Sequence, residues 1–244
     1  MLAVLMAGCG DGRTETQRDD PADASAGTSN ASSSAPRVVA TAIQLAASVP
    51  DLARRLAPSA GAWRADGASL SSPGARASSA GNLGAWLPTR ASGALRIGLR
   101  QSEAHTFTLT PQAARDVEVE EVEGRAVYRD AYEATDVLFV ATQARVEWMY
   151  LLRDPSAPSR FTYALSLPPG LPQVTREAAG GLAFVDANGE ARLHVPEPYA
   201  LDAKGTRRAA RVTAEHGELV VSLDTAGLVY PVLLDPAVET PAWR

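Results

Sequence analysis

Residues 127–140 read VYRDAYEATDVLFV, and this stretch decides how the rest of the chain is interpreted. We interpret it as the end of a strand at Val127, a polar turn that holds Asp130 and Asp136, and an apolar strand that ends at Val140. β-Branched and aromatic residues dominate both arms, as is typical of strands. Segments of similar character lie on both sides of it along the chain, which predicts an all-β domain.

The regular spacing of short apolar runs extends this prediction from Trp63 onward, where Gly, Ser and Pro separate one run from the next. Residues 145–151 alternate strictly and place Val146, Trp148 and Tyr150 on one side, which predicts a half-buried strand. Many short strands joined by turns indicate a two-layer antiparallel β-sandwich-like domain. The strands we expect are 83–87, 94–99, 106–110, 117–122, 126–129, 137–141, 145–151 and 161–167.

Two hairpins can be aligned from the sequence, because their turns contain residues that tolerate positive φ. A two-residue turn at Asn188 and Gly189 collects the larger apolar residues on one face, and a one-residue slip would lose that sorting. It pairs Phe184 with Leu193, Leu182 with Val195, and Asp186 with Ala191. A second turn at His216 and Gly217 pairs Ala214 with Leu219, Val212 with Val221, Ala210 with Leu223, and Glu215 with Glu218.

The N-terminal third differs from the rest. Residues 10–36 contain no Val, Ile, Leu, Met or aromatic residue. Such a segment cannot bury enough apolar surface to offset the entropy of ordering, so we expect a disordered tether before a β-rich domain at 37–240. Residues 38–57 fit a strand or a helix equally well, and Pro50 and Asp51 suit a first helical turn, which predicts a short helix near 50–57.

The first ten residues, MLAVLMAGCG, resemble a bacterial lipobox, in which a signal peptidase cuts before a cysteine that is then lipidated. The resemblance makes residues 1–9 the remnant of a lipoprotein signal and Cys9 the site of lipidation. Met6 stands where this motif usually has Leu, and eight residues are fewer than a complete signal sequence needs, so we expect the true start to lie upstream. A chance apolar N-terminus is the alternative.

The C-terminal half carries a second resemblance. VYRDAYEATDVLF is followed by VEWMYLLRDPSAPSRFTYALSLPPG, GGLAFVDANGEARLHVPEPYALDAKG and LVVSLDTAGLVYPVLLDP. Over residues 121–236 this order resembles a β-rich module of large bacterial surface proteins, including Rhs-type (tyrosine–aspartate repeat) proteins and myxobacterial lipoproteins with kelch-like repeats. The resemblance implies a location at the cell surface and a non-catalytic role. Together with a lipid anchor on Cys9 at the cell envelope, this leads us to expect a structural or interaction module whose partners are the membrane and other surface proteins or polysaccharide.

Candidate chemistry is sparse, and we expect no catalytic residue, cofactor or metal. His105, His194 and His216 lack the spacing of a metal site, and neither a nucleophile elbow nor a phosphate loop is present. A net charge of -5, with only Arg207, Arg208 and Arg211 clustered, argues against nucleic acid.

The best candidate surface turn holds Tyr128, Asp130, Tyr132 and Asp136. Its carboxylates would suit Ca²⁺, or they would accept backbone N–H bonds in a turn. A tyrosine hydroxyl there would most simply reach a backbone group across a loop. We therefore expect a surface module, with a polysaccharide- or Ca²⁺-binding sandwich as the alternative and a hydrolase as a remote one.

Overall fold

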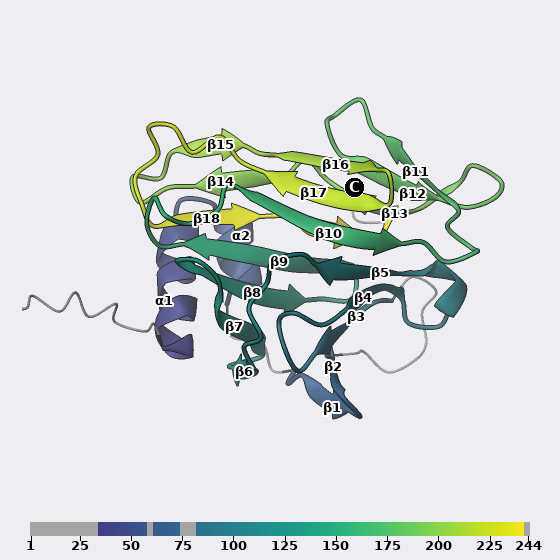
Figure 1. The fold of residues 1–244 in the computed structure, drawn as a ribbon, viewed down its shortest axis with the longest axis horizontal. Coiled ribbons are helices and arrows are strands. Elements are labelled where there is room, and N and C mark those ends of the chain that lie inside the picture. The colour runs from purple at the N-terminus through teal and green to yellow at the C-terminus, as the bar shows by residue number, and fades with distance from the viewer. Residues whose placement is uncertain (1–33, 58–60, 74–81, 242–244) are drawn as a thin grey trace, which may run out of the picture. The chain divides into compact units, whose positions relative to one another are not determined.

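The computed structural model describes residues 34–57, 61–73 and 82–241 (Figure 1). Cys9 and residues 10–33 of the expected tether lie outside these ranges. Within them the chain forms two antiparallel sheets and two helices, so the predicted all-β, sandwich-like class is confirmed.

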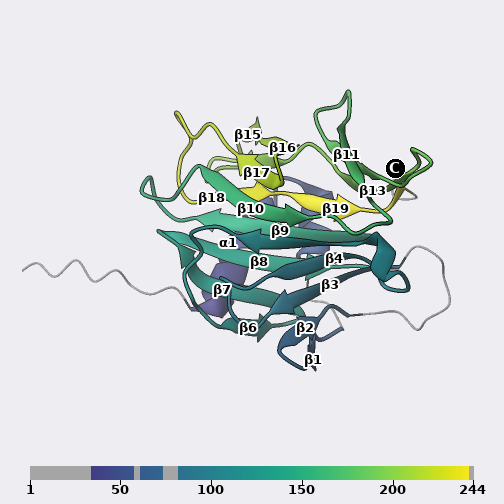
Figure 2. The same ribbon diagram turned by 45° about the vertical axis from the view of Figure 1, so that its right-hand side comes forward.

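The first sheet has eight strands, and its order follows the chain except where three later strands join it. Figures 1 and 2 show β3 and β4 together at one side of this sheet and the β16–β17 hairpin at the other. In spatial order the strands are β1 (Arg64–Asp66), β2 (Ser69–Ser71), β3 (Leu83–Pro88), β4 (Leu95–Leu99), β5 (Thr106–Pro111), β10 (Arg160–Ser166), β17 (Glu218–Ser222) and β16 (Arg211–Glu215).

The second sheet has eleven strands and is organised around β9, which pairs with β8 on one edge and with both β18 and β19 on the other. The sheet therefore divides beyond β9. One branch contains β18 (Val232–Asp235), β14 (Tyr199–Leu201) and β15 (Arg207–Ala209), and the other contains β19 (Ala237–Glu239), β13 (Ala191–Val195), β12 (Leu182–Val185) and β11 (Gln173–Arg176). On the opposite edge lie β8 (Thr135–Ala141), β7 (Arg125–Tyr132) and β6 (Val119–Val122), next to β9 (Arg145–Leu152).

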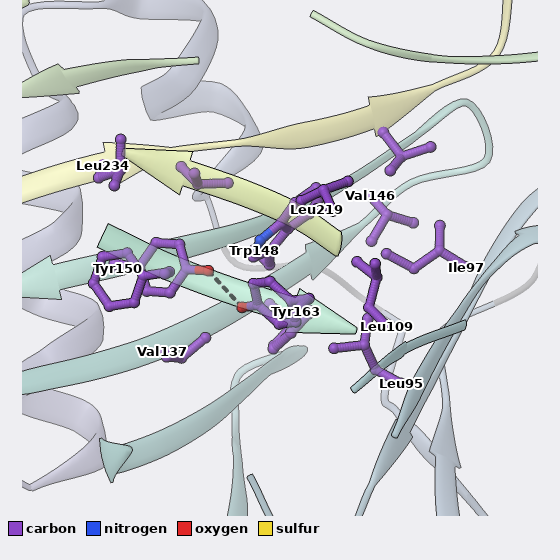
Figure 3. Close-up of a cluster of buried hydrophobic side chains, with 14 of the residues drawn as sticks. Leu95, Ile97, Leu109, Val137, Val146, Trp148, Tyr150, Tyr163, Leu219 and Leu234 are labelled. Atoms are coloured by element: carbon purple, nitrogen blue, oxygen red, sulfur yellow. Dashed lines mark hydrogen bonds between the residues drawn. The ribbon is translucent and has the colours of Figure 1, made fainter. Parts of the chain in front are cut away.

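The main core lies between the two sheets (Figure 3). Trp148 and Tyr150 of β9 pack there against Tyr163 of β10 and Leu219 of β17, and all four side chains are buried. The hydroxyls of Tyr150 and Tyr163 hydrogen-bond to each other inside this core. An aromatic stripe on β9 is therefore core, as the alternation of the sequence predicted.

A second core lies on the other face of the eleven-stranded sheet, beneath α1 (Ala35–Ala46) and α2 (Pro50–Arg55). Met149 and Leu151 of β9 pack here, so every residue of β9 is buried and the expectation of a half-buried strand is wrong. The reason is that α1 and α2 pack on the outer face of the eleven-stranded sheet. This face would be exposed to solvent in a two-layer sandwich, but here it is buried against the helices.

The helices also resolve the ambiguous N-terminal segment. Residues 38–46 are helical, and the short helix predicted near 50–57 is confirmed as α2. Pro36 and Pro50 occupy first-turn positions, where a missing N–H is tolerated. Because α1 begins at Ala35, the last two residues assigned to the tether belong to the folded body.

The hairpin at His216 and Gly217 has the predicted register from Val212 opposite Val221 to Glu215 opposite Glu218. The φ values of His216 and Gly217 are 53° and 77°, as a tight two-residue turn requires. Ala210 and Leu223 lie just beyond the ladder. The like-charged pair is relieved by Gln112, whose Nε2 donates to Glu218 at 3.0 Å.

For the hairpin at Asn188 and Gly189, the predicted pairs farther from the turn are confirmed, and the pair nearest the turn is wrong. Leu182 lies opposite Val195 and Phe184 opposite Leu193, but a β-bulge then places Val185, not Asp186, opposite Ala191. The reason is the Asp186 carboxylate, which accepts the N–H groups of Asn188 and Glu190 and binds the Arg192 guanidinium. This local capping favours a wider loop over a two-residue turn.

Candidate functional site

The predicted acidic turn is an ion-paired bulge at the edge of the main core. Asp130 adopts a φ of 53° within β7, where the pairing with β8 is interrupted between Tyr128 and Tyr132. The Oδ1 atom of Asp136 accepts the Asp130 N–H at 2.8 Å and Arg153 Nη1 at 2.6 Å. The second arm of the same guanidinium binds Asp130. Arg153 thus supplies the positive charge that a cation would bring to these carboxylates.

Neither tyrosine of this candidate turn is exposed, and Asp136 is also buried, so the expected surface turn is wrong at three of its four side chains. The Tyr128 hydroxyl donates to the carbonyl of Pro88, which is the backbone contact that the sequence suggested. Tyr132 packs edge-on against Phe161 at 5.1 Å between ring centroids, and burial raises its pKa to about 12. Both rings line a cavity of about 20 Å³ between the sheets, which has room for a single water molecule.

The other predicted positions lie apart from one another. Asn188, Gly189, His216 and Gly217 are at exposed hairpin tips. His194 is buried with its Nδ1 3.0 Å from Glu177 Oε1, and His105 contacts Ser102. Within residues 34–57, 61–73 and 82–241, three or more His, Cys, Asp or Glu side chains never gather in a way that suits a metal ion.

A buried ion cluster beneath α2 could not be identified from the sequence. It consists of Arg55, Arg145, Glu147, Asp235 and Glu239. Glu147 Oε1 accepts from Arg55 Nε at 2.5 Å and from Arg145 Nε at 2.9 Å, and Arg145 Nη1 donates to Glu239 at 2.6 Å. The cluster fixes α2 to β9, β18 and β19 by charge as well as by apolar contact.

Asp235 is the exception in this cluster. Arg55 Nη2 lies 3.6 Å from Asp235 Oδ2, beyond hydrogen-bond distance. Tyr199 is its cross-strand partner, but neither carboxylate oxygen has a partner with hydrogen-bond geometry among the described residues. Burial, and next the charge of Glu147, raises the pKa of Asp235 to about 7.

A hollow of about 550 Å³ is the other feature that the sequence did not reveal. Both sheets contribute to it, and its wall includes Arg160, Arg176 and Arg211, with Glu197 and Asp224 beside them. Strand pairing through β17 brings Arg160 near Arg211, whereas Arg176 reaches the hollow from the other sheet. We refer to this feature as the arginine hollow.

The fold and these sites define a class: a β-sandwich whose larger sheet is covered by two short helices. In comparisons with known proteins, no family model matches the chain, and no curated protein or solved structure is significantly similar to it. Among the described residues, neither helix has the length and apolar character that crossing a membrane would require.

Proposed function

We propose that the chain is a non-catalytic module of the bacterial cell envelope, held at a membrane by a lipid on Cys9 and presenting a folded β-sandwich for contact with other surface components. The proposal combines the lipobox-like N-terminus with the resemblance over residues 121–236. The module would have a structural role or bind other components of the cell surface.

The observation that carries this proposal is the order of three parts along the chain. An apolar run ends at Cys9, residues 10–34 contain no large apolar side chain, and the helix that starts the packed body begins at Ala35. A polar stretch of this length between a lipid-bearing cysteine and a folded body supports the proposal, because its composition is that of a linker.

The experiment is metabolic labelling with a palmitate analogue in the bacterial host, using the protein expressed from its own gene with a C-terminal tag. Wild-type protein should incorporate label and sediment with membranes. Cys9→Ser should lose the label and appear in the soluble fraction, whereas the matched variant Met6→Leu, which brings the motif nearer the usual lipobox, should be labelled at least as well. Unlabelled, soluble wild-type protein would refute the anchor.

The alternative binding functions are Ca²⁺ binding and polysaccharide binding, and the contacts of the charged side chains support the second. The carboxylates of Asp130 and Asp136 are bound by Arg153, which supports a structural use of that turn rather than Ca²⁺ binding. Polysaccharide binding gains support from the arginine hollow, because its charged and hydroxyl-bearing wall is suited to a polar, hydrated ligand.

A further inference from the structure

The arginine hollow is built by strand register rather than by a mobile loop. Arg160 of β10 lies opposite Ser222 of β17, and Ser222 lies opposite Arg211 of β16. The three residues therefore share one face of the eight-stranded sheet, with a small serine between the two arginines. The Cα atoms of Arg160 and Arg211 are two strand spacings apart, which is about 10 Å.

The other sheet supplies the third arginine. Arg176 is the last residue of β11, directly before the turn that contains Gly180, and both residues line the same hollow. A Cβ atom at Gly180 would fall 2.6 Å from Oε1 of Glu197, so this carboxylate lies close over the turn. The hollow is thus walled by two sheets, which fixes the positions of the backbones that carry its charged side chains.

The charges of these three arginines are not paired with a carboxylate of any residue that the structure describes. Arg153 binds two aspartates and Arg145 binds two glutamates, whereas Arg160, Arg176 and Arg211 are exposed and form no side-chain hydrogen bond or ion pair with any described residue. Solvated arginines on edge strands can serve merely to prevent strand-to-strand association, and β11 and β16 are edge strands. β10 lies between β5 and β17, but its pairing with β5 begins only at Tyr163, so Arg160 is paired on the β17 side alone. What strand-edge protection does not explain is that all three arginines, from both sheets, line the same hollow.

The chemistry of the wall indicates the ligand. Guanidinium groups bind carboxylates and other oxyanions through paired, charge-assisted hydrogen bonds. Ser159 and Ser222 add hydroxyls, while Glu197 and Asp224 can accept hydrogen bonds from hydroxyl groups of a ligand. The volume falls in the range of small-ligand sites, but the wall is polar where most such sites are apolar.

We propose that the arginine hollow binds an acidic saccharide, with Arg160, Arg176 and Arg211 on its carboxylates and Glu197 on its hydroxyls. An acidic oligosaccharide carries regularly spaced carboxylates with hydroxyl groups between them, which matches a wall of separated guanidinium groups with acceptors among them. A nucleic acid strand fits less well, because no described aromatic side chain on which a base could stack lines the hollow. The proposal deepens the interaction role given above, but its test does not require the lipid.

The test is calorimetric titration of the full chain in solution with oligogalacturonate, with a neutral malto-oligosaccharide and a single-stranded oligonucleotide as comparison probes. Oligogalacturonate should bind, more weakly as salt is added, and the neutral sugar should not. Arg160→Gln and Arg211→Gln should each weaken binding by about tenfold or more, because each removes a charge-assisted contact. Arg64→Gln, an exposed arginine on β1 outside the hollow, is the matched control and should change affinity by less than about twofold.

Folding can be checked independently, because the side chains of Arg160, Arg176 and Arg211 have no hydrogen-bond or ion-pair partner in the described part of the chain. Each variant should melt within about 2 °C of wild type. Arg211→Lys keeps the charge but loses the planar fork, so it should still weaken binding several-fold. The proposal is overturned by an absence of oligogalacturonate binding, by equal losses in Arg64→Gln and the hollow variants, by full affinity in Arg211→Lys, or by binding of the oligonucleotide alone. Labelling of Cys9 is unaffected by any of these results, so the two proposals fail separately.

Discussion

Asp235→Asn should change how stability depends on pH. The carboxyl group lies in the buried ion cluster, where Arg55 and Arg145 are already matched in charge by Glu147 and Glu239. An ionised Asp235 would add a buried negative charge next to Glu147, and the Tyr199 side chain and the two arginines offset that cost only in part. Asparagine has nearly the same shape but cannot ionise, so the substitution isolates the effect of this one charge.

The direction follows from the pKa of Asp235, which burial raises from 3.8 to about 7. Below about pH 4 the carboxyl is protonated in the folded and unfolded chains alike, and the folded state carries no penalty. Between about pH 4 and pH 7 the unfolded chain releases the proton while the folded chain keeps it, so stability falls as pH rises. Above about pH 7 both states are ionised and the loss is complete.

The magnitude can be worked from the same values. Each unit of pKa difference corresponds to about 1.4 kcal/mol, so the full loss is about 4 kcal/mol. Between about pH 5 and pH 8 the loss due to Asp235 is about 2 to 3 kcal/mol. The stability of Asp235→Asn relative to wild type should improve by that amount over this interval.

The assay is urea unfolding of the full chain at about pH 5 and pH 8, comparing wild type, Asp235→Asn and the control Asp51→Asn. Asp51 lies on α2 with a side chain that is 70% exposed, so its substitution should shift stability equally at both pH values. A difference between wild type and Asp235→Asn that stays constant with pH would mean that Arg55 and Arg145 hold Asp235 ionised, and it would refute the reasoning.

Two further substitutions test other parts of the fold, each measured by the urea midpoint and slope. Arg153→Gln removes the guanidinium that pairs with the fully buried Asp136 and should lower the free energy of unfolding by about 2–4 kcal/mol. The control Arg115→Gln breaks an exposed pair with Glu133 and should lower it by less than about 1 kcal/mol. Equal losses would contradict the structural role of Arg153. Tyr163→Phe removes the hydroxyl that hydrogen-bonds to Tyr150 in the core and should lower the free energy of unfolding by about 1–2 kcal/mol. The control is Tyr230→Phe, because the Tyr230 hydroxyl bonds no described residue. Equal stability of the two variants would contradict the contact between Tyr150 and Tyr163.

The longer strands were predictable because each depends on a local pattern, whereas short strands such as β1, β2, β11 and β19 were not predicted. The register of the hairpin at His216 and Gly217 follows from the turn and the alternation of its arms alone. The same reasoning misplaced Asp186, because a side chain that caps its own loop can outweigh the preferred turn. It also misplaced Asp130, which lies in a bulge inside β7 rather than in a connecting turn.

What the sequence could not reveal depends on contacts between distant segments. Glu147 alternates with Val146 and Trp148, and an acidic residue at that position ordinarily marks the solvent face of a strand. Its partner Arg55 comes from a helix 92 residues earlier, and no local signal announces that this helix will cover β9. The arginine hollow has the same origin, since Arg160 and Arg211 become neighbours only through their common partner strand.

The way the chain uses its arginines is the strongest reason to look for function in the hollow rather than at the acidic turn. Arg55, Arg145 and Arg153 each contact two carboxylates, and in each case at least one of those carboxylates is buried. These ion pairs stabilise the contact of α2 with β9 and the bulge in β7, and a ligand could bind these arginines only by breaking the ion pairs. The arginines of the hollow have no such role, so a ligand's oxyanion would displace only water. At the arginine hollow, the two sheets therefore bring together three arginines that form no ion pair with a described residue.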